Sequence, residues 1–182
     1  MSRFIAVFIA LCLVSGASLA AGDSTKQAES FIHYYTALCL DNVDDLAALR
    51  EQLAPMPTLP PEKASRFLNG KEGDAWPIPD DHGRFVLALP DGNRFCAVFA
   101  RRADTEWSES AFIDLVSETP VSLQSTQVLD ETRQTGANGE VHHIAWEWSA
   151  YGHPRKLHFM LTTASLPSAS TQALGSLAIV ER

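Results

Sequence analysis

The chain has 182 residues, with 14 Lys plus Arg against 22 Asp plus Glu, which gives a formal net charge of −8 at pH 7. This length is enough for one domain with a substantial hydrophobic core. The acidic balance argues against a nucleic-acid-binding protein and against binding to anionic membrane surfaces, because both functions call for a basic patch. It is compatible with a basic protein partner.

Residues 1–20 are predicted to be a secretory signal peptide. Arg3 supplies the positive start, an apolar run follows, and Ser18 and Ala20 place small residues at the −3 and −1 positions of a cleavage site. The apolar run is too short for a spanning helix, which needs about 20 residues. We therefore expect residues 21–182 to form a single secreted or periplasmic α+β domain, with no membrane insertion after cleavage.

Two cysteines remain after Cys12 leaves with the leader, namely Cys39 and Cys96. An even pair in an exported protein is normally joined, so the sequence predicts a disulfide between them. The alternative is a pair of buried free thiols. A metal site is disfavoured because neither cysteine has a CxxC or CxxH neighbour.

Four helices are predicted from apolar residues that recur at helical spacing. Ser24 and Gln27 are spaced as a capping box at the start of the first helix, and Asn42 is the expected cap of the second. The expected ranges are 24–39, 42–53, 62–69 and 105–117.

A first hairpin is predicted over 83–101, with two apolar arms around Pro90-Asp91-Gly92-Asn93. Neither arm alternates between apolar and polar residues, so both faces are expected to be covered, as in the centre of a sheet. The register stays open between a two-residue loop and a three-residue loop with a bulge.

A second hairpin is predicted over 141–150 and 156–164, where apolar and polar residues alternate. Pairing Ala150 with Arg155 brings every large apolar residue onto one face, which favours this register. The expected pairs are Trp148 with Leu157, Trp146 with Phe159, and Ile144 with Leu161. A weaker strand signal lies at 121–132, and a last strand is predicted near 174–180. The predicted fold is α+β, a single domain with an antiparallel sheet of about five or six strands and helices packed on one face.

Residues 70–83 are predicted to be a long irregular connection, a kind of segment that often carries function. Its single tryptophan is either a binding anchor or a plug over the core. The candidate binding surface consists of Glu72, Asp74, Trp76, Asp80, Asp81 and His82.

A second candidate site lies in the second hairpin, where Glu147 is expected opposite His158, with His143 on the same strand face. These groups suit an acid–base pair or a weak metal site, but they are equally typical of a structural cross-strand pair on the solvated side of a sheet. His142 points with the tryptophans and is interpreted as a core histidine with satisfied hydrogen bonds. The sequence contains no GxSxG, HExxH, GxxxxGK[ST] or GxGxxG motif, and no cofactor is expected.

In several short sequence features, the chain resembles an uncharacterised family of small exported proteobacterial proteins. These features are the leader, Phe31 through Cys39-Leu40, Trp76, Gly83-Arg84-Phe85, Cys96 and Leu161-Thr162-Thr163. The resemblance implies no activity and no catalytic residue. The function predicted is a secreted or periplasmic non-catalytic binding or inhibitory module acting on another envelope protein, with a basic protein as the favoured partner. The alternative is a small periplasmic hydrolase or metal-binding protein that uses Glu147, His158 and His143.

Overall fold

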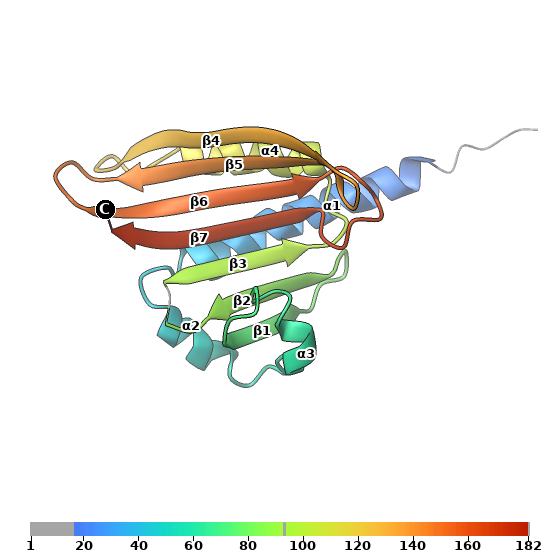
Figure 1. Cartoon of the computed structure of the whole chain (residues 1–182), viewed down its shortest axis with the longest axis horizontal. Helices are drawn as coiled ribbons and strands as arrows, with labels where there is room; N and C mark the ends of the chain where they lie inside the picture. Colours follow the sequence, from blue (N-terminus) through green and yellow to red (C-terminus); the bar gives the residue numbers. More distant parts are fainter. Residues whose placement is uncertain (1–16, 93, 182) are drawn as a thin grey trace, which may run out of the picture.

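A computed structural model describes the backbone of residues 17–92 and 94–181, and side chains from residue 23 onward. Most of the predicted signal peptide, and Asn93 of the predicted turn, lie outside the described residues. Seven strands form one antiparallel sheet in the order β1-β2-β3-β7-β6-β5-β4 (Figure 1). The strands are β1 (Gly73–Ile78), β2 (Phe85–Pro90), β3 (Phe95–Ala100), β4 (Gln124–Thr135), β5 (Gly139–Ser149), β6 (Arg155–Ala164) and β7 (Ala173–Glu181). The predicted mixture of helices with an antiparallel sheet is therefore confirmed.

The strand that the prediction missed is β1, so five or six strands was too low a number. Its sequence contains Gly73 and Pro77, which read as loop residues because glycine and proline weaken strands. The sheet accepts them because β1 is an edge strand that pairs only with β2, so a proline there need not interrupt a ladder on both sides. Residues 70–83 are thus not a wholly irregular loop.

The helices are α1 (Ala17–Tyr34), its π-helical continuation η1 (Tyr35–Leu40), α2 (Leu46–Leu53), α3 (Pro61–Ala64) and α4 (Thr105–Ser117). The range of α4 matches the prediction, whereas α1 begins before Ser24 and α3 is much shorter than expected. Asn42 does not cap α2, because its side-chain amide donates to the carbonyls that end η1, at 2.8 Å from the oxygen of Ala37. Asp45 caps α2 instead, accepting from the backbone N–H of Ala48 at 3.0 Å. No helix among the described residues is long and apolar enough to cross a membrane.

The helices do not all lie on one face of the sheet. The main core joins α1, η1 and α4, through residues such as Phe31, Tyr35 and Phe112, to strand residues that include Leu87. A second, smaller core lies where α3 and the turn after it pack on Ala88. Because successive strand residues point to opposite faces, the two cores are on opposite sides of β2. The prediction of helices on one face therefore fails for α3.

Both predicted hairpins are present, but only in the second does the observed register match a predicted one. In the first, β2 and β3 are interior strands as expected, and they are joined by residues 91–94, a longer connection than either loop that we considered. In the second, β5 and β6 pair as the apolar pattern predicts. The observed pairs include Trp148 with Leu157, Trp146 with Phe159, and Ile144 with Leu161.

The predicted disulfide is present and joins η1 to β3. The Cα atoms of Cys39 and Cys96 are 5.4 Å apart, and both residues are fully buried in the main core. The bond therefore connects the first helical segment to the middle of the sheet. The residues between the two cysteines contain α2, α3, β1 and β2.

The other edge of the sheet is β4, the longest strand, which is exposed along most of its length. Its pairing with β5 is interrupted between Gln127 and Leu129, where Val128 is an extra residue without a partner in the ladder. Val128 is 44 % exposed. The edge therefore carries a bulge near its middle.

Candidate functional site

The acidic residues of the predicted binding surface do not form one face. Glu72 and Asp74 lie at the start of β1, and Asp80 and Asp81 follow its end. A strand of this length separates its two ends by about 20 Å. Asp74 is also engaged, because its carboxylate forms an ion pair with Arg50 of α2.

Asp80 serves the turn between β1 and β2. Its carboxylate accepts hydrogen bonds from the hydroxyl of Tyr34 at 2.9 Å and from the backbone N–H groups of His82 and Gly83 at 2.7 and 2.8 Å. Burial raises the pKa of Asp80, but these hydrogen bonds outweigh burial and hold the pKa below its ordinary value. Burial and the nearby Asp80 raise the pKa of Tyr34 to about 12.

Trp76 is not an exposed anchor. Its side chain belongs to the main core and the residue is 2 % exposed, so the plug interpretation is the one that the structure supports. His82 is exposed beside Asp80. The six residues of the predicted surface therefore comprise a core tryptophan and two separate groups of polar residues.

The second candidate site forms only in part. Glu147 lies directly opposite His158, as predicted, with 3.6 Å between Oε1 and the ring Nδ1. Contrary to the expectation of a solvated face, Glu147 is only 5 % exposed, and Nζ of Lys156 lies 2.6 Å from its Oε2. This lysine was missed because it pairs with Ser149, two residues along β5 from Glu147, and reaches the carboxylate diagonally across the ladder.

His143 does not join this pair. Ala145 lies between His143 and Glu147 on the same strand face, which separates their Cα atoms by about 13 Å. The ring Nδ1 of His143 instead lies 2.9 Å from the hydroxyl of Thr162 on β6. The part of the chain that the structure describes contains no group of three or more His, Cys, Asp or Glu placed to hold a metal ion.

His142 has partners for its ring nitrogens on the opposite face, as predicted, but it is half-buried near the β4 edge rather than a core residue. Its Nδ1 lies 3.1 Å from Glu109 of α4 and its Nε2 lies 2.9 Å from Asp130 of β4. Burial lowers the pKa of His142, but the two carboxylates outweigh burial and raise the pKa above its ordinary value. The hydrogen bond from His142 is the main cause that lowers the pKa of Asp130. This cluster fastens α4 to the β4–β5 edge of the sheet.

A cleft of about 800 Å³ opens where β1 and β3 end and β2 begins. Its floor is apolar and is formed mainly by half-buried Phe67, Val86 and Phe99. The rings of Phe67 and Phe99 meet edge to face, with 5.0 Å between their centroids. The far wall is the connection between β6 and β7, which contributes Ser168, Ser170 and Thr171.

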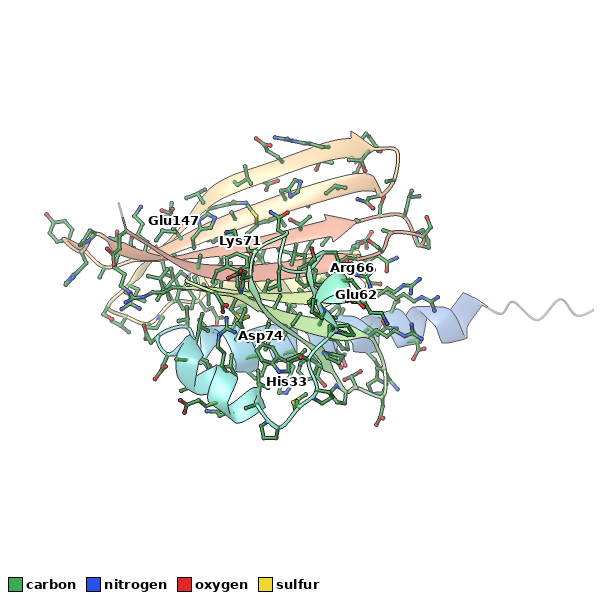
Figure 2. The ribbon with its side chains drawn as sticks, turned by 60° about the horizontal axis from the view of Figure 1, so that its bottom comes forward. His33, Glu62, Arg66, Lys71, Asp74 and Glu147 are labelled. Carbon is green, nitrogen blue, oxygen red and sulfur yellow. A yellow bond between two sulfur atoms is a disulfide. The ribbon has the colours of Figure 1, made fainter. Side chains whose placement is uncertain are left out.

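The rim of this cleft is basic. Arg66, Arg84 and Arg101 all line it and all are exposed. A neighbouring hollow shares Arg84 and Arg101 with it and is lined by Arg102 and by three aspartates, Asp23, Asp80 and Asp81. Among the described residues, none of these arginines forms an ion pair with a carboxylate. The guanidinium carbon of Arg66 lies 4.9 Å from the ring centroid of Phe67. Arg66 and Glu147 lie in separate parts of the molecule (Figure 2).

Sequence reasoning missed this cleft, although part of its signal was available. Arg84 immediately precedes one arm of the first hairpin and Arg101 immediately follows the other, so an antiparallel pairing places the two side by side. The backbone N–H of Arg101 donates to the carbonyl oxygen of Arg84 at 3.3 Å. Arg66 and the 168–171 wall come from distant segments that no local pattern connects.

No protein-family model and no curated protein matches the chain. The resemblance to a family of small exported proteobacterial proteins therefore stays a prediction.

Proposed function

We propose that the protein is a non-catalytic binding module of the cell envelope, secreted or periplasmic, which recognises or inhibits another envelope protein through the cleft at the end of β1, β2 and β3. The observation that carries this proposal is the combination of half-buried aromatic rings on the floor with exposed arginines on the rim. Aromatic residues and arginine are the side chains most enriched in protein interfaces and among their energetically dominant residues.

Export is supported by two independent features. The first residues have the composition of a secretory leader. The disulfide between Cys39 and Cys96 is of a kind that forms and persists in oxidising compartments such as the periplasm. A protein that works there meets other envelope proteins.

The alternative, a small hydrolase or metal-binding protein that uses Glu147, His158 and His143, has less support. The carboxylate of Glu147 is occupied by Lys156, and His143 interacts with Thr162 rather than with Glu147. These contacts are typical of cross-strand pairs that stabilise a sheet.

The proposed site also differs from the acidic surface predicted from the sequence. Asp74 and Asp80 are held by Arg50 and Tyr34, so their charges already have partners within the molecule. The arginines at the cleft have no such carboxylate partners among the described residues, which leaves their guanidinium groups available for a ligand.

The proposal is tested by capture from envelope extract with immobilised residues 21–182 as bait, followed by titration of the captured protein in purified form. Phe67→Ala removes an aromatic ring from the cleft floor, and Tyr151→Ala removes a ring of similar size that is 96 % exposed in the β5–β6 turn. We expect Phe67→Ala to weaken binding at least about tenfold, as for a dominant interface residue, while Tyr151→Ala leaves binding unchanged.

The circular-dichroism spectrum of each variant controls for folding. Equal affinities for the wild type and Phe67→Ala would place the binding surface elsewhere and overturn the proposal. A turnover activity that disappears with Glu147→Gln would replace the binding module with the enzyme alternative.

A further inference from the structure

We propose that the cleft binds an acidic segment of a partner protein, in which carboxylate side chains flank an apolar one. This inference rests on the proposed function and names the chemistry of the partner. The charge proposed for the partner segment is negative, whereas the net charge of this chain favours a positively charged partner.

The cleft is lined by more basic than acidic residues. Three arginines line it, against a single acidic residue, Asp80, in a chain whose formal charge is −8. Asp80 is satisfied by the hydroxyl of Tyr34 and by two backbone N–H groups, and it forms no ion pair with the arginines among the described residues. The cleft is therefore a locally basic place on an acidic molecule.

The cations at the cleft are all arginines, and this favours carboxylate groups as their ligands. Arg84 and Arg101 stand at the adjacent ends of paired strands, and Arg66 faces them from the segment after α3. A guanidinium group is a planar fork of donors that matches the two oxygens of a carboxylate. Several such forks around one hollow suit a chain with several Asp or Glu side chains.

The floor supplies the apolar half of the recognition. Phe67, Val86 and Phe99 are half-buried, so each leaves apolar surface exposed at the bottom of the cleft. The stacking of Arg66 on Phe67 holds one charge directly beside this surface. A leucine, phenylalanine or similar side chain that covers these rings would have its flanking carboxylates near the arginines.

The shape favours a chain segment over an enclosed small molecule. Sites for small ligands bury most of the ligand surface, whereas the charged rim here is exposed. The wall formed by Ser168, Ser170 and Thr171 offers hydroxyl groups that can donate to and accept from a peptide backbone.

The experiment selects binders from a random-peptide phage library on immobilised residues 21–182 and measures synthetic versions of the enriched peptides by fluorescence anisotropy. We expect a consensus with several Asp or Glu around one large apolar residue. Replacing the acids of that peptide by Asn and Gln should weaken binding at least about tenfold, and raising NaCl from about 50 to 300 mM should weaken it severalfold.

Two variants with the same change in net charge locate the effect. The pair Arg84→Gln and Arg101→Gln removes two charges from the cleft, and the pair Arg94→Gln and Arg133→Gln removes two exposed charges elsewhere. We expect about fivefold or greater weakening from the first pair, as for two rim ion pairs, and no change from the second. Equal effects of both pairs would indicate a general charge effect and overturn the inference.

The remaining outcomes separate this inference from the proposed function. If the enriched peptides have a basic or neutral consensus, or if no peptide is enriched, the inference that the cleft binds an acidic segment is wrong. Displacement of the peptide by dodecanoate, with dodecanoate binding more tightly than any peptide, identifies a small amphiphile as the ligand and also overturns it. If the captured envelope protein still binds the Arg84→Gln, Arg101→Gln variant but not Phe67→Ala, the binding module stands and only its acidic partner is wrong.

Discussion

Opening the bond between Cys39 and Cys96 should lower the stability of the protein by about 4 kcal/mol. The two residues are 57 positions apart, and the entropy that a cross-link of this span removes from the unfolded chain corresponds to that amount at 25 °C. Measured losses for disulfides of small exported domains fall at about 2–5 kcal/mol. Such a loss is a large fraction of the roughly 5–15 kcal/mol that stabilises an ordinary domain.

The variant for this test is the pair Cys39→Ala and Cys96→Ala. Both cysteines are fully buried, so serine would add the cost of burying a hydroxyl group to the loss of the bond. Unfolding by denaturant is followed for the oxidised wild type, the wild type in reductant and the double variant. The last two should agree with each other and lie well below the first.

The loss should also be unevenly distributed over the fold. The residues between the cysteines contain β1, β2, and the Arg66 and Arg84 sides of the cleft, whereas β5 and β6 lie outside this loop. Amide hydrogen exchange should therefore accelerate first in β1 and β2. A stability loss below about 1 kcal/mol would refute the loop-entropy argument, and equal acceleration in β5 and β6 would refute the local one.

Three further changes test separate parts of the structure. Trp148→Phe removes a buried indole N–H that donates to the backbone carbonyl of Val116 at 2.6 Å. The free energy of unfolding, measured with denaturant, should fall by about 1–3 kcal/mol. A loss near zero would mean that the carbonyl finds another donor. Gly175→Ala would bring a methyl carbon to 2.8 Å from the ring of Tyr35. We therefore expect the free energy of unfolding to fall by about 1–3 kcal/mol and the near-ultraviolet spectrum to change. An unchanged melting temperature would contradict that packing. Because the pKa of His142 is raised in the folded protein, its stabilisation is fully present below the ordinary value of about 6.5 and is lost as the pH rises through the raised value. The stability difference between the wild type and His142→Gln should therefore shrink on the alkaline side, and a difference that grows with pH would be evidence against the raised pKa.

The parts of the fold that could be predicted are those in which a local pattern has one physical solution. The register of β5 and β6 was predictable because Trp146, Trp148 and Phe159 share one face, and a slip by one residue would separate the two strands' large apolar residues onto opposite faces. The disulfide followed from the cysteine count. Asn42 shows the limit of such patterns, because an asparagine between two helices can bond to the end of the first or cap the second, and the choice depends on the chain path.

The site was harder to predict because its residues are brought together by tertiary structure. The adjacency of Arg84 and Arg101 follows from the first hairpin alone, but the position of Arg66 depends on α3 packing on the less expected face of the sheet. The burial of Glu147 likewise depends on Lys156, whose long side chain reaches it diagonally. The basic partner expected from the net charge stays a prediction, because net charge averages over the whole surface and does not report a local group such as the three arginines at the cleft.

The bulge in β4 affects how copies of this protein behave when they meet. A long strand at the edge of a sheet is a template on which another chain can add a strand, and this is a common route to aggregation. In β4 the extra residue, Val128, breaks the regular spacing of the outward-facing N–H and C=O groups, and the charges of Asp130 and Arg133 follow it. Deleting Val128 would straighten the edge and make it a better template. A single inserted residue thus makes this edge a poorer template for pairing between copies of the chain.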